Sequence, residues 1–311
     1  QRPSGARAAL ETRYREFEAA YREKQSLGYD TSQIEPLVTA GKRAYRAGNL
    51  EKANRILSDA QQMLDSLPAP ALAGAGAAEK GFPSELQYTR IGVAFGQTYS
   101  GQQFVPHIKD LGINQTGIYL HWSDLQPARD KFDWRLLDAF VSQLDGQMNA
   151  LVGIKSSSPW GSKVKGIQGG SLPTDMEAYR NFVYSTVKRC QGKVKYWMRD
   201  WEASSLGPSY WKGTAEEYAR LQKVFYEAVK TADPNALVIL GGHNGFFSPK
   251  GEPSNYQFMD SVFKSAGDSF DLFDLRLYTD PYTIPQRVNW FRARMAQYGL
   301  RKPFVSTDFG G

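Results

Sequence analysis

The sequence predicts an α/β fold, a (β/α)8 TIM-type barrel that extends as far as its seventh strand and follows a small helical segment. Two observations lead to this prediction. From residue 88 onward, short β-like runs alternate with helical stretches at regular intervals, which is typical of βαβ units and a parallel sheet. Residues 1–67 instead carry apolar residues at helical spacing. We therefore expect a helical segment at 1–67, a linker at 68–84 and a barrel at 85–311.

The N-terminal segment reads as three helices. The first covers residues 6–28 and ends at Gly28, and Asp30 and Thr31 are positioned to cap a second helix over residues 35–48. A third helix follows at 49–67. The stretch "AYRAGNLEKANRILSDA" resembles one tetratricopeptide-like unit, but a solenoid needs several. We expect a small helical hairpin or three-helix appendage that packs on the barrel or mediates self-assembly or partner contact. The Ala-, Gly- and Pro-rich stretch at 68–84 predicts a linker.

Seven β-like runs follow, at residues 88–95, 115–122, 150–157, 194–200, 237–242, 273–278 and 303–309. Helical stretches between them include 133–146, 176–192, 214–233 and 285–299. A doubly wound open sheet is the alternative to a barrel. The turn after the first run, "AFGQTYSGQQF", has no G-x-G-x-x-G, which disfavours a dinucleotide site. Because the chain stops at Gly311, before an eighth strand, we expect the barrel to be incomplete at its C-terminal side.

Composition excludes several classes of function. The formal charge is +6, but basic and acidic residues are interleaved, so we expect no nucleic-acid binding. There is no apolar run of membrane-spanning length. A single cysteine, Cys190, allows no internal disulfide, and three histidines without metal-ligand spacing predict neither a metal nor another cofactor. The chain begins at Gln1 without an apolar leader, as a mature secreted protein would, so we expect a secreted or periplasmic location.

In a barrel the active site forms at the carboxyl ends of the strands. The residues at these ends are rich in carboxylates and aromatic rings, and Glu202 and Asp308 end the fourth and seventh runs. Two carboxyl groups across a barrel mouth suit glycoside hydrolysis, in which one is protonated and the other ionised. Aromatic rings offer flat apolar faces to sugars. Candidate substrate-binding residues are Trp122, Trp160, Trp201, Asn244, Arg276 and Tyr278.

Residues 88–311 resemble the clan A glycoside hydrolases, families 39 and 5 in particular. The resemblance rests on "GIYLHWSDLQPARDKFDWRLLDAFV", on "KYWMRDWEASS" with the helix that follows it, and on "FDLFDLRLYTDPYTIPQRVNWFRARMAQYGLRKPFVSTDFGG". It implies a barrel with the acid/base, Glu202, on the fourth strand and the nucleophile, Asp308, on the seventh. It also implies a carbohydrate partner: a β-linked oligo- or polysaccharide that is cleaved by a retaining mechanism without a cofactor.

Three positions depart from the pattern of these families. Trp201 stands where an asparagine precedes the acid/base, Arg276 stands where the sixth strand carries a histidine, and the nucleophile is the shorter Asp308 rather than a glutamate. These changes favour a second hypothesis. In it, the chain is a catalytically degraded glycosidase-like protein that binds glycan or serves as a structural or assembly subunit.

Overall fold

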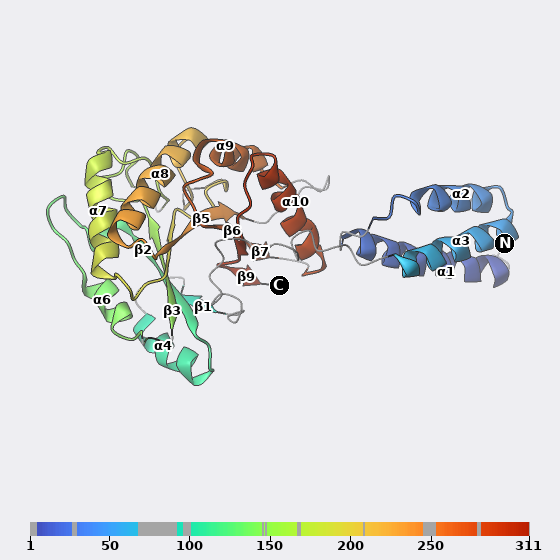
Figure 1. The fold of residues 1–311 in the computed structure, drawn as a ribbon, viewed down its shortest axis with the longest axis horizontal. Helices are drawn as coiled ribbons and strands as arrows, with labels where there is room; N and C mark the ends of the chain where they lie inside the picture. Colours follow the sequence, from blue (N-terminus) through green and yellow to red (C-terminus); the bar gives the residue numbers. More distant parts are fainter. Residues whose placement is uncertain are drawn as a thin grey trace. The chain divides into compact units, whose positions relative to one another are not determined.

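The computed structural model describes residues 5–26, 30–67, 92–95, 101–144, 146, 148–166, 169–207, 209–244, 253–278 and 281–310. The chain divides into two compact units (Figure 1). One comprises Gln1–Phe82 with Tyr282–Asn289, and the other Pro83–Pro281 with Trp290–Gly311. The expected linker at 68–84 lies outside the described residues, so its boundaries stay a prediction.

The described residues of Gln1–Phe82 form three helices, α1 (Gly5–Ser26), α2 (Glu35–Arg46) and α3 (Leu50–Ser66). Their buried core includes Leu10, Phe17, Leu57 and Leu64, so this segment has an apolar interior of its own. The predicted cap of the second helix is wrong, because α2 begins at Glu35 after Ile34. Asp30 and Thr31 form a turn ahead of it, in which the Ile34 N–H donates to the Thr31 carbonyl at 2.9 Å. The expected first-helix end at Gly28 falls outside the described residues.

The second unit is built on a parallel sheet with strand order β1-β2-β3-β4-β5-β6-β8. Its strands are β1 (Val93–Phe95), β2 (Gln115–His121), β3 (Asn149–Lys155), β4 (Tyr196–Arg199), β5 (Leu237–His243), β6 (Leu272–Leu275) and β8 (Phe304–Val305). Each strand lies beside the next one along the chain, whereas a doubly wound sheet reverses its strand order. The barrel-type prediction is therefore confirmed. Within the described residues the sheet is not closed.

Two predicted strands are interrupted at the sheet's carboxyl edge. The run 273–278 breaks at Arg276 into β6 and β7 (Leu277–Tyr278), and the run 303–309 breaks into β8 and β9 (Phe309–Gly310). β7 and β9 pair with each other as a separate parallel ribbon. This ribbon brings the segment around Asp308 next to the end of β6.

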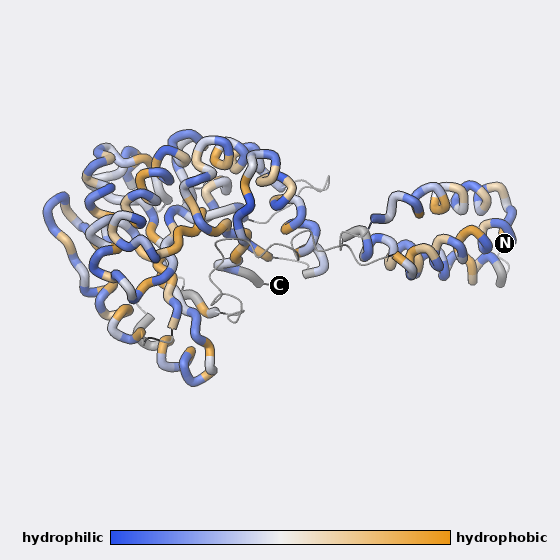
Figure 2. Tube along the Cα trace, viewed as in Figure 1, coloured by the Kyte–Doolittle hydropathy of each residue, from blue (hydrophilic) through white to orange (hydrophobic). Residues whose placement is uncertain are grey.

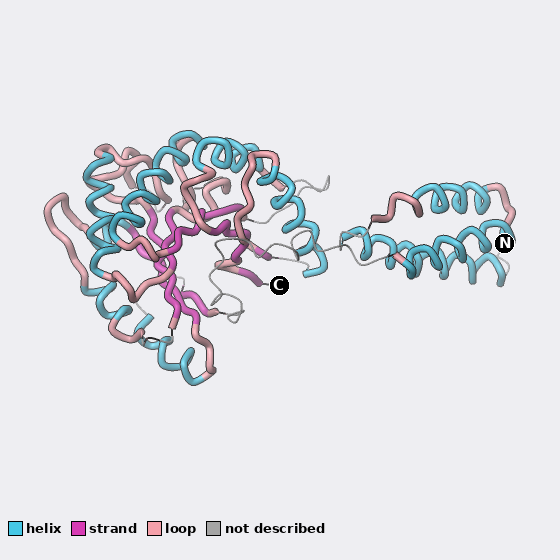
Figure 3. Tube along the Cα trace, in the orientation of Figure 1, coloured by secondary structure: helices cyan, strands magenta, loops and turns pink. Residues whose placement is uncertain are grey.

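Helices follow the strands and cover the sheet's outer face (Figure 3). They are α4 (Gly101–Asp110), α5 (Trp122–Leu125), α6 (Arg135–Val141), α7 (Met176–Arg189), α8 (Ala215–Ala232), α9 (Tyr256–Ala266) and α10 (Ile284–Ala296), with a 3-10 turn at Pro281–Thr283. Local sequence explains where two of them begin. Asp175 caps α7, and Thr214 and Glu217 form a reciprocal capping box at α8. No helix among the described residues has the length and apolar character needed to cross a membrane.

Strands β3, β4, β5 and β6 bury both faces, and orange segments of the sheet in Figure 2 show their apolar character. On one face, Phe273 packs against Phe263 of α9, with ring centroids 5.3 Å apart. On the opposite face, side chains from four strands form a separate cluster: Leu151, Tyr196, Met198, Ile239 and Leu272. This cluster faces away from the helices, so it lies on the inner, concave-side face of the barrel-type sheet. The functional candidates lie above it, at the carboxyl ends of the same strands.

Candidate active site

Asp308 is held by a buried arginine. Nη1 of Arg276 lies 2.6 Å from Oδ2 of Asp308, and Nε of the same guanidinium lies 3.1 Å from Oδ2 of Asp274. The Arg276 and Asp274 side chains are buried, whereas 49% of the Asp308 side chain is exposed. The Tyr278 hydroxyl also hydrogen-bonds to the Asp308 carboxylate. Asp308 therefore presents a carboxylate to solvent while two donors fix it from behind.

The backbone beside Asp308 is fixed as well. The Thr307 N–H donates to Oδ1 of Asp274 at 2.8 Å, and the Thr307 carbonyl accepts from the Tyr119 hydroxyl at 3.3 Å. The Leu277 N–H donates to the Asp308 carbonyl at 3.3 Å. These contacts come from β2, β6 and β7, so three strand ends determine where the Asp308 side chain starts.

Glu202 has a different environment. Burial raises the pKa of its carboxyl group, and the negative charges of Asp274 and Asp308 raise it further, while Arg276 and Lys155 act in the opposite direction. The net effect favours the protonated acid. Among the described residues no hydrogen bond reaches this carboxyl group, in contrast to the doubly held Asp308.

The surrounding donors keep their protons. Burial opposes the charged form of Arg276, but the charges of Asp274, Tyr119, Glu202 and Asp308 outweigh it and raise the guanidinium's pKa. Burial raises the pKa of both Tyr119 and Tyr278 to about 12, and at Tyr278 the hydrogen bond to Asp308 adds to the effect. Both tyrosines can therefore act as hydrogen-bond donors at neutral pH.

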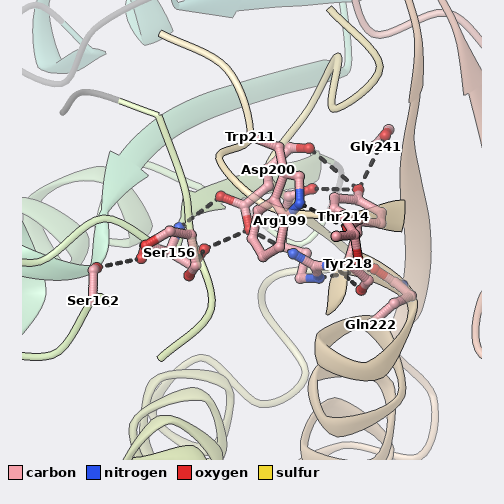
Figure 4. Close-up of polar contacts among 10 residues, drawn as sticks. Ser156, Ser162, Arg199, Asp200, Trp211, Thr214, Tyr218, Gln222 and Gly241 are labelled. Atoms are coloured by element: carbon pink, nitrogen blue, oxygen red, sulfur yellow. Dashed lines mark hydrogen bonds and ion pairs between the residues drawn. The ribbon is translucent and has the colours of Figure 1, made fainter. Parts of the chain in front are cut away.

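The turn that carries Glu202 is strained and densely bonded (Figure 4). Asp200 and Glu202 adopt left-handed backbone angles, with φ of 37° and 54°. The Asp200 carboxylate accepts from the Ser156 N–H at 2.8 Å and from the Ser156 hydroxyl at 2.7 Å, and it pairs with Nη1 of Arg199 at 2.5 Å. Arg199 in turn donates to Gln222 and to the Tyr218 carbonyl of α8.

Trp201, between these two strained residues, points into the barrel. Its ring lies 4.5 Å from that of Tyr119 and packs on the interior cluster. The Lys155 ammonium lies 4.5 Å from the indole centroid and also donates to the Ser209 carbonyl. Gly153 makes room for the Tyr119 ring on which the indole packs, because a Cβ there would lie 2.4 Å from Cδ1 of Tyr119. The indole is thus a partly buried lining of the site's floor.

Of the other predicted substrate residues, Trp122 is fully buried, and Trp160 and Asn244 are partly buried. Trp122 has no exposed surface and packs on Trp160, Tyr179 and Phe182, so the expectation that its ring stacks on a sugar is corrected: it is a core residue. Trp160 is partly buried, and its indole N–H donates to the Gln126 carbonyl at 2.8 Å. Asn244 is partly buried at the end of β5 and donates to the Ser205 hydroxyl at 3.0 Å.

The sequence prediction missed four residues that hold the candidate acids: Tyr119, Ser156, Arg199 and Asp274. Asp274 had a visible signal, since it is an acid inside the otherwise apolar run "LFDL". A charge buried in a strand needs a partner, and Arg276 lies two residues further on. The described residues contain no group of three or more His, Cys, Asp or Glu side chains that could hold a metal ion.

Comparisons with known proteins place this fold among glycoside hydrolases. No protein-family model matches the chain, and no curated protein matches it. A monomeric β-xylosidase from Caulobacter crescentus CB15 is similar at 15% identity and a TM-score of 0.55, over 72% of this chain and 52% of that one. A glucosidase from Croceicoccus marinus is similar at 16% identity and a TM-score of 0.50, over 66% and 47%.

A family 39 glycoside hydrolase from the gut symbiont Bacteroides cellulosilyticus WH2 is similar at 21% identity and a TM-score of 0.46, over 61% of this chain and 38% of that one. The chain spans about half the length of these structures or less. The xylosidase and the glucosidase show the fold alone at these identities, and at the level of the fold the resemblance to glycoside hydrolases is confirmed.

Proposed function

We propose that the second unit is a retaining glycoside hydrolase that cleaves a β-linked oligo- or polysaccharide, with Glu202 as acid/base and Asp308 as nucleophile. The observation that carries the proposal is the contrast between two carboxyl groups at one barrel mouth. Glu202 is half-buried with a raised pKa, while Asp308 is bound by an arginine and a tyrosine. The reaction requires one carboxyl group that donates a proton and a second that attacks, and these two environments suit those two roles.

The roles follow from these environments. Protonated Glu202 donates its proton to the leaving oxygen while an Asp308 oxygen attacks the anomeric carbon, and the glycosidic C–O bond breaks as the glycosyl–Asp308 ester forms. Glu202, now ionised, removes a proton from water, which attacks the same carbon and releases Asp308. Asp308 is one methylene shorter than glutamate, and the hydrogen bonds to Thr307 and the β7–β9 pairing set how far its carboxylate reaches.

The proposal is tested with aryl β-xylosides, β-glucosides and β-mannosides, on the unmodified chain and on Glu202→Gln and Asp308→Asn. We expect turnover with retained anomeric configuration, seen by proton NMR of the first product. Removing the acid at Glu202 should lower turnover roughly 10²–10⁴-fold for poor leaving groups and far less for dinitrophenyl glycosides. Asp308→Asn should abolish turnover of both kinds of substrate, because it removes the nucleophile. Asp138→Asn, on the surface of α6, is the control and should keep full activity.

A second candidate function is glycan binding without turnover, and the position of Trp201 favours it. The indole lies at the floor of the site beside Tyr119 and Lys155, where a larger side chain reduces the space next to Glu202. Saturable binding of an oligosaccharide by calorimetry, with no hydrolysis of any glycoside by the unmodified chain, would favour this function over the enzyme.

We also propose that the protein is secreted and that residues 1–67 mediate assembly. Cell fractionation tests the first proposal, and light scattering of chains with and without residues 1–67 tests the second.

A further inference from the structure

The turn after β4 combines unusual backbone angles with unusually complete support. Two non-glycine residues within three positions, Asp200 and Glu202, have positive φ. Such conformations persist only where surrounding contacts determine them, and they concentrate at functional sites. The Glu202 carboxyl group itself receives no hydrogen bond among the described residues. Its position therefore depends on the backbone of this turn.

Contacts hold the turn from two sides (Figure 4). Directly after β3, the N–H and hydroxyl of Ser156 donate to the Asp200 carboxylate at 2.8 and 2.7 Å. From α8, the Tyr218 hydroxyl lies 3.2 Å from the Asp200 carbonyl and 3.1 Å from the Gly241 carbonyl of β5. Ser156, Asp200 and Tyr218 are all buried. The Asp200 carboxylate is thus bound from one side, and on the other side the Asp200 and Gly241 carbonyls share the single proton of the Tyr218 hydroxyl.

Two glycines leave the space that this arrangement needs. A Cβ on Gly241 would lie 2.5 Å from the Arg199 carbonyl oxygen and 2.9 Å from Cα of Trp201. A Cβ on Gly170 would lie 1.9 Å from Oδ1 of Asp200. The backbone of the turn therefore approaches Gly241, and the Asp200 carboxylate approaches Gly170, more closely than a residue with a side chain would permit.

We propose that Ser156, Asp200 and Tyr218 are positioning residues that act through the β4 turn to hold the Glu202 carboxyl group in its half-buried place at the barrel mouth. The proposal rests on the proposed role of Glu202 as the acid, because positioning has a catalytic meaning only for a reacting group. If these residues merely stabilised the fold, their loss would lower stability without moving Glu202.

The experiment compares two tyrosines on consecutive helices. Tyr218→Phe removes the hydroxyl that binds the turn, and Tyr179→Phe is its matched control. Tyr179 is equally buried on α7, and its hydroxyl has no hydrogen-bond partner among the described residues. Ser156→Ala tests the other side of the turn, with Thr186→Val as a control that loses a buried hydroxyl bonded within α7. These mild changes avoid the unpaired Arg199 charge that Asp200→Ala would leave.

The first readout needs no turnover. Glutamate labelled with ¹³C at the carboxyl carbon, assigned through Glu202→Gln, gives the titration midpoint of Glu202 in each full-length variant. Because burial is the main cause of the raised pKa, freeing the turn should lower the midpoint toward the ordinary glutamate value. We expect this fall in Tyr218→Phe and Ser156→Ala and an unchanged midpoint in both controls.

The second readout is kinetic, with the aryl glycosides above. Misplacing the acid should reduce kcat roughly ten- to a hundredfold with little change in KM, and the controls should keep the original kcat. A lowered midpoint without turnover in any variant would support positioning and overturn the glycosidase. A midpoint and kcat unchanged in both test variants, with melting temperatures lowered as in Thr186→Val, would overturn the positioning proposal.

Discussion

Arg276 and Lys155 both act on the charge of Glu202, but among the described residues only Arg276 is bonded to a carboxylate of the site. Lys155 lies between Trp201 and the Ser209 carbonyl, and its charge lowers the pKa of Glu202 against the effect of burial. This makes Lys155 the simpler residue with which to probe the acid.

We predict that Lys155→Met shifts the alkaline limb of the kcat/KM pH profile to higher pH. A general acid must be protonated, so the rate falls above its pKa. Removing a positive charge that favours the ionised form raises that pKa. The control is Lys163→Met, whose ammonium pairs with Glu217 on the surface and should leave the limb in place. A limb that moves to lower pH would contradict the electrostatic assignment.

His243 predicts how stability depends on pH. It is fully buried and contacts the Ser254 carbonyl at 2.5 Å, and burial lowers its pKa to about 4. The unfolded chain takes up a proton here near the ordinary pKa of 6.5, whereas the folded chain does so only near pH 4. Protonation therefore favours the unfolded state, and the stability that neutral His243 allows is fully present above about pH 6.5 and is lost as pH falls toward 4.

From this shift we expect the free energy of unfolding to fall by about 2 kcal/mol between pH 7 and pH 5 through this residue alone. His243→Gln keeps an N–H donor but does not titrate, so its urea unfolding should show a smaller loss over the same range. An equal loss in both proteins would assign the acid sensitivity to other groups, among which His121 also has a pKa lowered by burial.

At the scale of elements, the link from β2 to α5 shows how a strand-end aromatic becomes core. Trp122 begins α5, which turns its indole inward to donate to Gln126 at 2.8 Å. We predict that Trp122→Ala costs about 3–5 kcal/mol in urea unfolding and that Trp160→Ala, a partly exposed neighbour, costs clearly less. Similar losses of unfolding free energy in the two variants would show that Trp122 contributes no more to the stability of this core than Trp160 does.

Periodicity was sufficient to predict the N-terminal helices, strands β2 to β5 and helices α6, α7, α8 and α10, because apolar spacing reflects which face an element buries. It did not separate β6 from β7, which are divided at Arg276, where the guanidinium pairs with Asp308, 32 positions away. Glu202 and Asp308 were predicted from their place at strand ends. The residues that hold them, such as Ser156 and Asp274, were missed because their partners are distant in sequence and the contacts are polar, which leaves no periodic signal.

For the whole molecule, the separate core of the N-terminal helices predicts that residues 1–67 fold alone. A fragment of that length should show helical circular dichroism and a cooperative thermal transition. Leu64→Ala, in the buried core, should destabilise it by about 2–5 kcal/mol, whereas the exposed Gln62→Ala should change little. A fragment without a cooperative transition would show that these helices need the rest of the chain.

Two separate cores also imply two folding rates. The helical unit is built from contacts between neighbouring segments, whereas each parallel strand pair must wait for an intervening crossover to be in place, and non-local pairing is slow. During synthesis the helices emerge first. They should reach their native state while the sheet still lacks its last strands, and the candidate acids should meet only after Asp308 has been synthesised. Refolding followed by helix signal and by tryptophan fluorescence should therefore show a fast phase and a slow one.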